Sequence, residues 1–174
     1  MKRILIGLGV AGVLAVLFVW FINMQKKSMP LQTQVSVEQE STSSAQSTLT
    51  YQGKILAGNS SPFLEFKKED YQKALADNKI ILLDFYATWC PICRAEEPII
   101  KEGFNLLDSD KIVGFRVNFN DPDTDEDEKQ LAKDFKVPYQ HTKIFLKNGK
   151  EFSRSVTSWT LPEFKDEAYK ALSN

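Results

Sequence analysis

The stretch IILLDFYATWCPIC (residues 80–93) leads from an apolar run directly into the only two cysteines of the chain. Residues 80–87 are apolar apart from Asp84, and such a run predicts a strand that is buried on both faces. The cysteines, Cys90 and Cys93, follow with two residues between them, and a helical pattern begins after them. A Cys-x-x-Cys motif at a strand-to-helix junction indicates a thiol–disulfide redox site.

The bulk composition narrows the class of protein. The chain has 174 residues, of which 43% are hydrophobic and 26% are charged, as is usual for a globular domain with an additional segment. The formal net charge of −1 gives no indication of a nucleic-acid partner. Two cysteines make neither a disulfide scaffold nor an all-cysteine zinc site. They are therefore a redox pair, part of a mixed ligand set, or inert.

The N-terminal region predicts a membrane anchor. Residues 4–22 are uncharged and almost wholly apolar, and as a helix they would be about 28 Å long, close to the hydrocarbon thickness of about 30 Å. We predict that residues 1–27 form an uncleaved single-pass signal anchor, because the run is long for a signal peptide and no small-x-small site follows. Residues 28–50 are rich in Ser, Thr and Gln and predict a flexible linker. We expect the folded domain, residues 51–174, on the extracytoplasmic side of the membrane.

The remaining residues alternate between strand and helix patterns. We predict strands at residues 64–66, 79–87, 112–119, 142–146 and 151–156, with helices at 68–78, 91–107, 126–135 and 160–172. Asn148-Gly149 predicts a tight hairpin between the last two strands. This order predicts an α/β fold with a mixed β-sheet flanked by helices. For the helix at 91–107, the inward residues are expected to include Ile92, Ala95, Ile99 and Leu106.

On these motifs, residues 64–172 resemble the thioredoxin family. Asp84 stands six residues before the first cysteine, where the family has a buried acid, and Pro98 stands five residues after the second, where the family has a helix-kinking proline. Residues 145–149 resemble the strand and turn of the family's hairpin. The resemblance implies a thioredoxin-like fold and a thiol–disulfide oxidoreductase that acts on protein thiols and disulfides. We expect no cofactor, and the redox partner is unknown.

The chemistry of disulfide exchange assigns a role to each residue of the motif. Cys90 stands where the helix begins, where free N–H groups and the helix dipole favour an anion, so it is expected to be the exposed attacking thiolate with a lowered pKa. Cys93 is expected to be shielded and to resolve the mixed disulfide, giving a Cys90–Cys93 disulfide. Asp84, in a dry strand, is expected to have a raised pKa and to accept the proton of Cys93. The expected substrate contacts are Trp89, Pro91, Ile92, Gln140 and Thr142.

The chain departs from the family pattern opposite the cysteines. The family's cis-proline followed by Thr falls on His141-Thr142, so His141, the only histidine, replaces the proline. The Gln140–His141 bond is expected to be trans, because a cis bond before a residue other than proline costs about 2.5–4 kcal/mol.

Three interpretations of His141 stay open. It could tune the Cys90 thiolate, or hydrogen-bond backbone in a loop. It could instead join Cys90 and Cys93 as a third ligand of zinc, copper or an iron–sulfur cluster. That last interpretation gives the alternative function, a metal- or cluster-binding or delivery protein, beside a membrane-tethered oxidoreductase.

Residues 121–128 are dense in carboxylates. Asp121, Asp123 and Asp125 copy the start of a calcium-binding loop, but the sixth position is Glu126 instead of Gly and the twelfth is Ala132 instead of Glu. We therefore predict no EF-hand. A solvated loop that places acids at the start of a helix is the better interpretation.

Overall fold

Six strands form one mixed sheet in the computed structural model, which describes residues 51–173. The strands are β1 (Ile55–Ala57), β2 (Phe63–Glu65), β3 (Ile80–Tyr86), β4 (Ile112–Asn118), β5 (Thr142–Lys147) and β6 (Lys150–Ser155). Their order across the sheet is β1-β2-β4-β3-β5-β6. The pairs β2–β4 and β4–β3 are parallel, whereas the pairs that involve β1, β5 and β6 are antiparallel. The predicted mixed sheet is confirmed.

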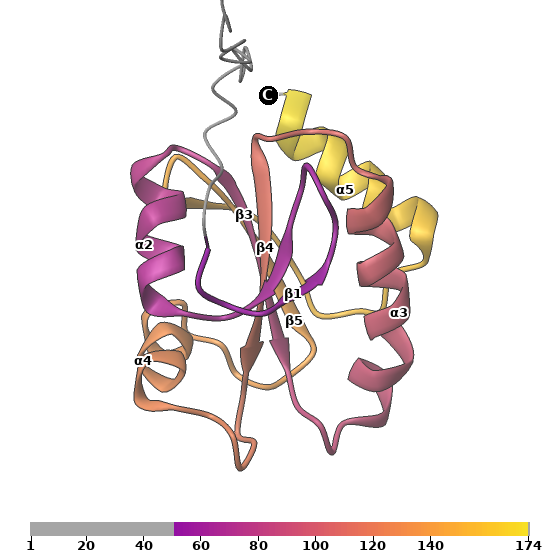
Figure 1. Ribbon diagram of the computed structural model, residues 1–174. Helices are drawn as coiled ribbons and strands as arrows, with labels where there is room; N and C mark the ends of the chain where they lie inside the picture. The colour runs from indigo at the N-terminus through magenta and orange to yellow at the C-terminus, as the bar shows by residue number, and fades with distance from the viewer. Residues whose placement is uncertain (1–50, 174) are drawn as a thin grey trace, which may run out of the picture. The chain divides into compact units, whose positions relative to one another are not determined.

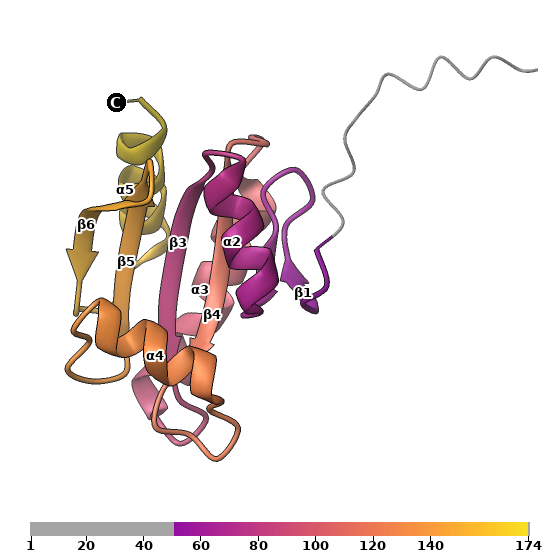
Figure 2. The ribbon, with the colours of Figure 1, turned by 90° about the vertical axis from the view of Figure 1, so that its left-hand side faces the viewer.

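Two layers of helices cover the sheet (Figure 1). The helices are α2 (Lys68–Ala76), α3 (Pro91–Leu106), α4 (Glu126–Asp134) and α5 (Leu161–Ser173). Helices α2 and α4 lie on one face and α3 and α5 on the other, and Figure 2 shows α2 and α4 in front of the sheet. Within residues 51–173, no helix is long and apolar enough to cross a membrane. The predicted anchor (1–27) and linker (28–50) lie outside the residues that the structure describes.

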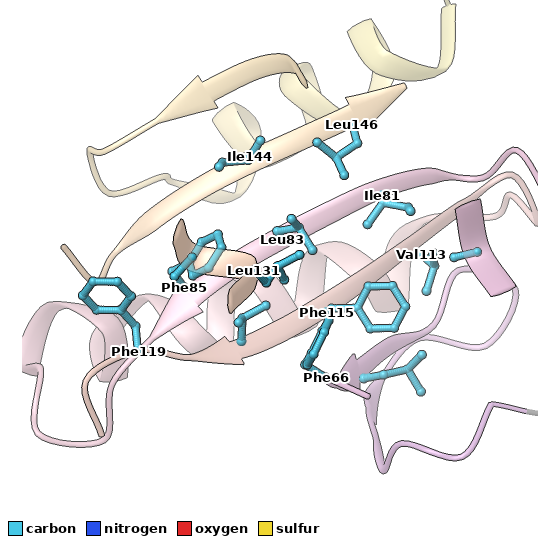
Figure 3. Close-up of a cluster of buried hydrophobic side chains, with 14 residues drawn as sticks. Phe66, Ile81, Leu83, Phe85, Val113, Phe115, Phe119, Leu131, Ile144 and Leu146 are labelled. Atoms are coloured by element: carbon cyan, nitrogen blue, oxygen red, sulfur yellow. The ribbon is translucent and has the colours of Figure 1, made fainter. Parts of the chain in front are cut away.

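The central strand, β3, is buried along its whole length. Its odd-numbered residues, such as Leu83 and Phe85, pack with side chains of β4 and β5 in the core beneath α2 and α4 (Figure 3). Its even-numbered residues, such as Leu82, pack against α3 and α5. The unbroken apolar run in the sequence therefore reflects a strand that has helices on both faces.

Helix α3 buries a different face from the one expected. Its buried residues are Cys93, Glu96, Ile100, Gly103 and Phe104. The predicted inward positions were wrong: Ile92 and Leu106 are about half exposed, Ala95 is exposed and Ile99 is only partly buried. The buried row lies one residue further along the helix than the predicted row. The apolar pattern did not indicate this row, because two of its members are a cysteine and a glutamate.

Two local features complete the sheet. The predicted hairpin is confirmed, since Asn148 and Gly149 both have positive φ angles, 52° and 71°, between the paired residues Lys147 and Lys150. Strand β1 was not predicted. It has three residues and pairs with β2 alone, so it has too few residues to give a recognisable pattern.

Helices α3 and α5 come close enough at Gly103 to exclude any side chain there. A Cβ atom at this position would lie 2.2 Å from Cδ1 of Phe164. We predict that Gly103→Ala lowers the free energy of unfolding by about 1–3 kcal/mol, because the cost of overpacking exceeds the gain in helix propensity. Urea denaturation followed by circular dichroism measures the change. The control is Glu102→Ala, one residue away at an exposed position. An increase in stability for Gly103→Ala would contradict this packing.

Candidate active site

The two cysteines lie at the carboxyl end of β3, where the chain enters α3 (Figure 1). Cys90 is the N-cap residue of α3, and Pro91 occupies the first helical turn, where its missing N–H costs nothing. Cys93 donates its backbone N–H to Sγ of Cys90 at 3.2 Å. The Cys90 sulfur thus satisfies one of the free N–H groups at the start of the helix. Both cysteines are free thiols in this structure.

Burial of the two sulfurs differs from the expectation. Cys93 is shielded as predicted, but Cys90 is also buried, with only 3% of its surface exposed, so the prediction of an exposed Cys90 was wrong. The cause is local, because Cys90 packs with Tyr86, Ala87 and Cys93 over the first turn of the helix. Burial raises the pKa of Cys93 to about 12, and the hydrogen bond with Cys90 adds to the rise. The Cys93 thiol therefore keeps its proton at neutral pH.

The loop before the cysteines is held by the end of β4. The side chain of Asp121 accepts hydrogen bonds from the backbone N–H and the hydroxyl of Thr88, and Trp89 donates its indole N–H to the carbonyl of Asn120 at 3.0 Å. Asp121 is buried, so the prediction of a solvated loop was wrong for this residue, although Asp123 and Asp125 are exposed. The position of Asp121 could have been predicted from the topology. Asp121 follows β4, which is parallel to β3, so both strands end at the same edge of the sheet.

Asp84 lies in the middle of the buried sheet, one strand away from a cation on either side. Its Cα register partners are Lys143 on β5 and Arg116 on β4. Burial raises the pKa of Asp84 to about 7, and Lys143 and Arg116 oppose the rise. Glu96 and Glu97 of α3 add to it. The predicted burial of Asp84 is confirmed, and the direction of its pKa shift is the one expected.

The backbone at His141 continues the sheet. The residues from 51 to 173 contain no cis peptide bond, so the Gln140–His141 bond is trans as predicted. His141 has a φ angle of 70°, which is unusual for a residue other than glycine, and donates its N–H to the carbonyl of Phe85 at 2.6 Å. A proline could not make this bond, because it has no N–H. The bond joins β3 to the residue just before β5.

The ring of His141 contacts Glu96 and Ser158. Its Nε2 is 3.2 Å from the hydroxyl of Ser158. Its Nδ1 is 3.0 Å from Oε2 of Glu96, a close approach without the alignment of a hydrogen bond. Burial and the neighbouring Lys143 lower the pKa of His141, and Glu96 opposes them, so the ring is neutral at pH 7. None of these contacts is with a thiol.

The metal-binding interpretation gains no support from this arrangement. Within the described part of the chain, no group of three or more His, Cys, Asp and Glu side chains is placed to hold a metal ion. Cys90, Cys93 and His141 are therefore not arranged as a ligand set.

The expected substrate contacts separate into two groups. Trp89, Pro91 and Ile92 are exposed beside the thiols, and Gln140 is partly exposed. Thr142 is fully buried, and its hydroxyl donates to the carbonyl of Tyr139 at 2.9 Å, so the prediction that it contacts substrate was wrong for its side chain. A hollow of about 330 Å³ lies next to the exposed group, and its lining consists of Pro91, Ile92, Ala95, Glu96, Ile99, Ser158 and Trp159.

Comparisons with known proteins agree with this geometry. The family model of thioredoxin matches residues 62–168. The chain belongs to the thioredoxin family. Thioredoxin H5 of Arabidopsis thaliana is 32% identical over 106 residues, which are 60% of this chain and 80% of that protein. Membership of this family shows that the chain is a thiol–disulfide oxidoreductase, as the sequence motifs predicted.

Solved structures show the same fold. Trxlp from Edwardsiella tarda EIB202 is 27% identical with a TM-score of 0.51, and the match covers 59% of this chain and 94% of that one. Thioredoxin from Aeropyrum pernix, at 17% identity and a TM-score of 0.52, shares the fold over 70% of this chain and 95% of its own.

The raised pKa of Asp84 predicts a specific dependence of stability on pH. The folded protein binds this proton more tightly than the unfolded chain, so the free energy of unfolding falls as the pH rises from about 4 to about 7. The loss is at most roughly 4 kcal/mol. Asp84→Asn, which cannot ionise, is expected to be more stable than the unaltered protein at pH 8 and to lose this advantage near pH 4. Urea denaturation at both values measures the effect, with the exposed Asp123→Asn as the control. An equal effect of Asp84→Asn at both pH values would contradict the raised pKa.

Proposed function

We propose that the Cys90–Cys93 pair exchanges disulfides with protein substrates beside a membrane, with Asp84 as the proton acceptor. The observation that carries the proposal is the arrangement at the start of α3, where the sulfur of Cys90 accepts the N–H of Cys93 and a buried carboxyl group lies on the adjoining strand. A thiolate at Cys90 accepts the same N–H, and the helix dipole favours its negative charge.

The reaction proceeds in two exchanges that balance in electrons and protons. The Cys90 thiolate attacks one sulfur of a substrate disulfide, which breaks and releases one substrate thiolate while a mixed disulfide forms. The Cys93 thiol then gives its proton to the Asp84 carboxylate and attacks Sγ of Cys90. The mixed disulfide breaks, and the second substrate thiolate leaves. The substrate gains the two electrons that the Cys90–Cys93 dithiol loses, and the reverse sequence oxidises a substrate dithiol.

The pKa values favour Asp84 as the acceptor. A carboxyl group whose pKa is about 7 is a usable base at neutral pH, and Asp84 is close enough to raise the pKa of Cys93. Part of that rise comes from the hydrogen bond with Cys90. Once the Cys90 sulfur belongs to a mixed disulfide, it is no longer an ionisable thiol, and the resolving step becomes easier at the moment when it is needed.

The surface beside the thiols suits a protein substrate. Trp89 and Ile92 are each 52% exposed, and the adjoining hollow has mostly apolar walls. Exposed aromatic and aliphatic side chains of this size are typical of docking surfaces. Because Cys90 is buried, docking on these residues also has to bring the substrate sulfur close to a recessed thiolate. His141 contacts the hydroxyl of Ser158, one of the residues that line this hollow.

The order of attack gives a test of the two cysteine roles. Cys93→Ser is expected to accumulate a mixed disulfide with a protein substrate such as insulin, because the second exchange is removed. Cys90→Ser is expected to form no such adduct. Non-reducing electrophoresis and mass spectrometry of the acid-quenched mixture measure both. Adducts that form through Cys93 in the Cys90→Ser variant would reverse the assignment.

The proposed membrane tether has its own test in the full chain. The uncharged residues 4–22 support the anchor, and two arginines within them would make insertion unfavourable. Leu14→Arg with Leu17→Arg is expected to move the protein from the membrane fraction to the supernatant after alkaline extraction. The matched control places two arginines in the polar linker, Gln32→Arg with Gln34→Arg, and is expected to stay with the membrane. If the unaltered protein is extracted at alkaline pH, the tether is wrong and the cysteine chemistry is unaffected.

A further inference from the structure

A row of five charged groups lies between the sheet and α3, three on adjacent strands and two on the helix. Lys143, Asp84 and Arg116 are register partners on three adjacent strands, so their side chains project from the same face. Both oxygens of Glu96 accept from Nζ of Lys143, at 2.9 and 2.8 Å, and Glu97 accepts from Arg116 at 2.7 Å. Two consecutive glutamates of the active-site helix therefore pair with the two cations on either side of Asp84.

The Lys143–Glu96 pair is deeply buried. Lys143 has no exposed surface and Glu96 has 4%. Glu96 also accepts the backbone N–H of Trp159, and Nζ of Lys143 lies 4.9 Å from the centre of the Trp159 ring. A pair of apolar side chains of similar volume is usually as stable as a buried ion pair, or more stable. Stability alone therefore does not explain why these two charges are present next to the site.

We propose that Lys143 and Glu96 are positioning residues that set the charge of the Asp84 carboxyl group for the resolving step. This inference rests on the proposed function, in which Asp84 takes the proton of Cys93. Lys143 and Arg116 carry two positive charges, and Glu96 and Glu97 balance them. At the outer side, Arg116 also pairs with Glu65 at 3.0 Å and Glu97 with Lys101 at 2.8 Å, which adds one charge of each sign. The row is neutral when Asp84 is protonated and has one net negative charge when Asp84 is ionised. The equilibrium between these two forms of Asp84 therefore depends on each charged partner.

Four charged side chains act on the ionisation of Asp84, two in each direction. Lys143 on β5 and Arg116 on β4 stabilise its carboxylate, whereas Glu96 and Glu97 on α3 and burial itself favour its protonated form. The Cys93 thiol is the proton donor. Lys143 is the strongest of the charged neighbours, so its removal has to disfavour the carboxylate, and removal of Glu96 has to favour it.

Two single variants give opposite predictions. The probe is the mixed disulfide of Cys90 with 5-thio-2-nitrobenzoate, from which Cys93 displaces a coloured thiolate. The midpoint of the displacement rate against pH is expected to rise by about one unit or more in Lys143→Gln and to fall in Glu96→Gln. The double variant is expected to return towards the unaltered midpoint. Glu126→Gln, an exposed acid on α4, is the matched control and leaves the midpoint unchanged.

The outcomes separate a charge role from a merely structural one. A structural role predicts slower displacement in both single variants with unmoved midpoints, and that result would overturn the proposal, as would shifts in the same direction. Absence of displacement in the unaltered protein at every pH would instead contradict the proposed function.

A measurement on the unaltered sequence covers the case in which a single variant does not fold. The ¹⁵N resonance of Lys143 Nζ is expected to shift with the same midpoint as the ¹³C resonance of the Asp84 carboxyl group, and to stop shifting in Asp84→Asn. A Lys143 resonance that does not respond while Asp84 titrates would overturn the proposal without reference to turnover.

Discussion

A carboxyl group at the centre of a sheet must either stay protonated or have cations beside it, and Asp84 meets this constraint in both ways. It is buried on β3, with Lys143 and Arg116 on the neighbouring strands. The two glutamates of α3 pair with these cations and reduce their effect, so the carboxyl group keeps a proton affinity suited to neutral pH. The order of strands in the sheet is what brings these charges together.

The same edge of the sheet positions the thiols. Strand β3 ends in a short loop that Asp121 holds from the end of β4, and the loop delivers Cys90 to the first turn of α3. Cys93 is then one turn further into the helix, shielded from solvent and within the electrostatic reach of Asp84. A single strand–loop–helix unit therefore supplies both thiols and the buried carboxyl group, and the burial that shields Cys93 also raises the pKa of its thiol.

The sequence alone predicted the parts that depend on local pattern. The run at 80–87, the spacing of Cys90 and Cys93, and the Asn148-Gly149 turn each have a short-range cause, and the structure has them as expected. The face of α3, the burial of Cys90 and the partners of Lys143 depend instead on contacts between distant elements. Glu96 lies in the buried row of α3, where amphipathic patterning predicts an apolar residue. Its partner Lys143 becomes apparent only from the pairing of β5 with β3, which places the two side chains within hydrogen-bond distance.

The central claim is that Cys90 and Cys93 form one reversible redox couple. Its most direct test is equilibration of the purified protein in glutathione buffers of graded potential, followed by acid quenching, alkylation and mass measurement. We expect a single two-electron transition, with a slope of about 30 mV for each tenfold change in the ratio of oxidised to reduced protein. The oxidised form should contain an intramolecular Cys90–Cys93 disulfide. Two free thiols at every potential, or a bound metal that blocks their alkylation, would contradict the account.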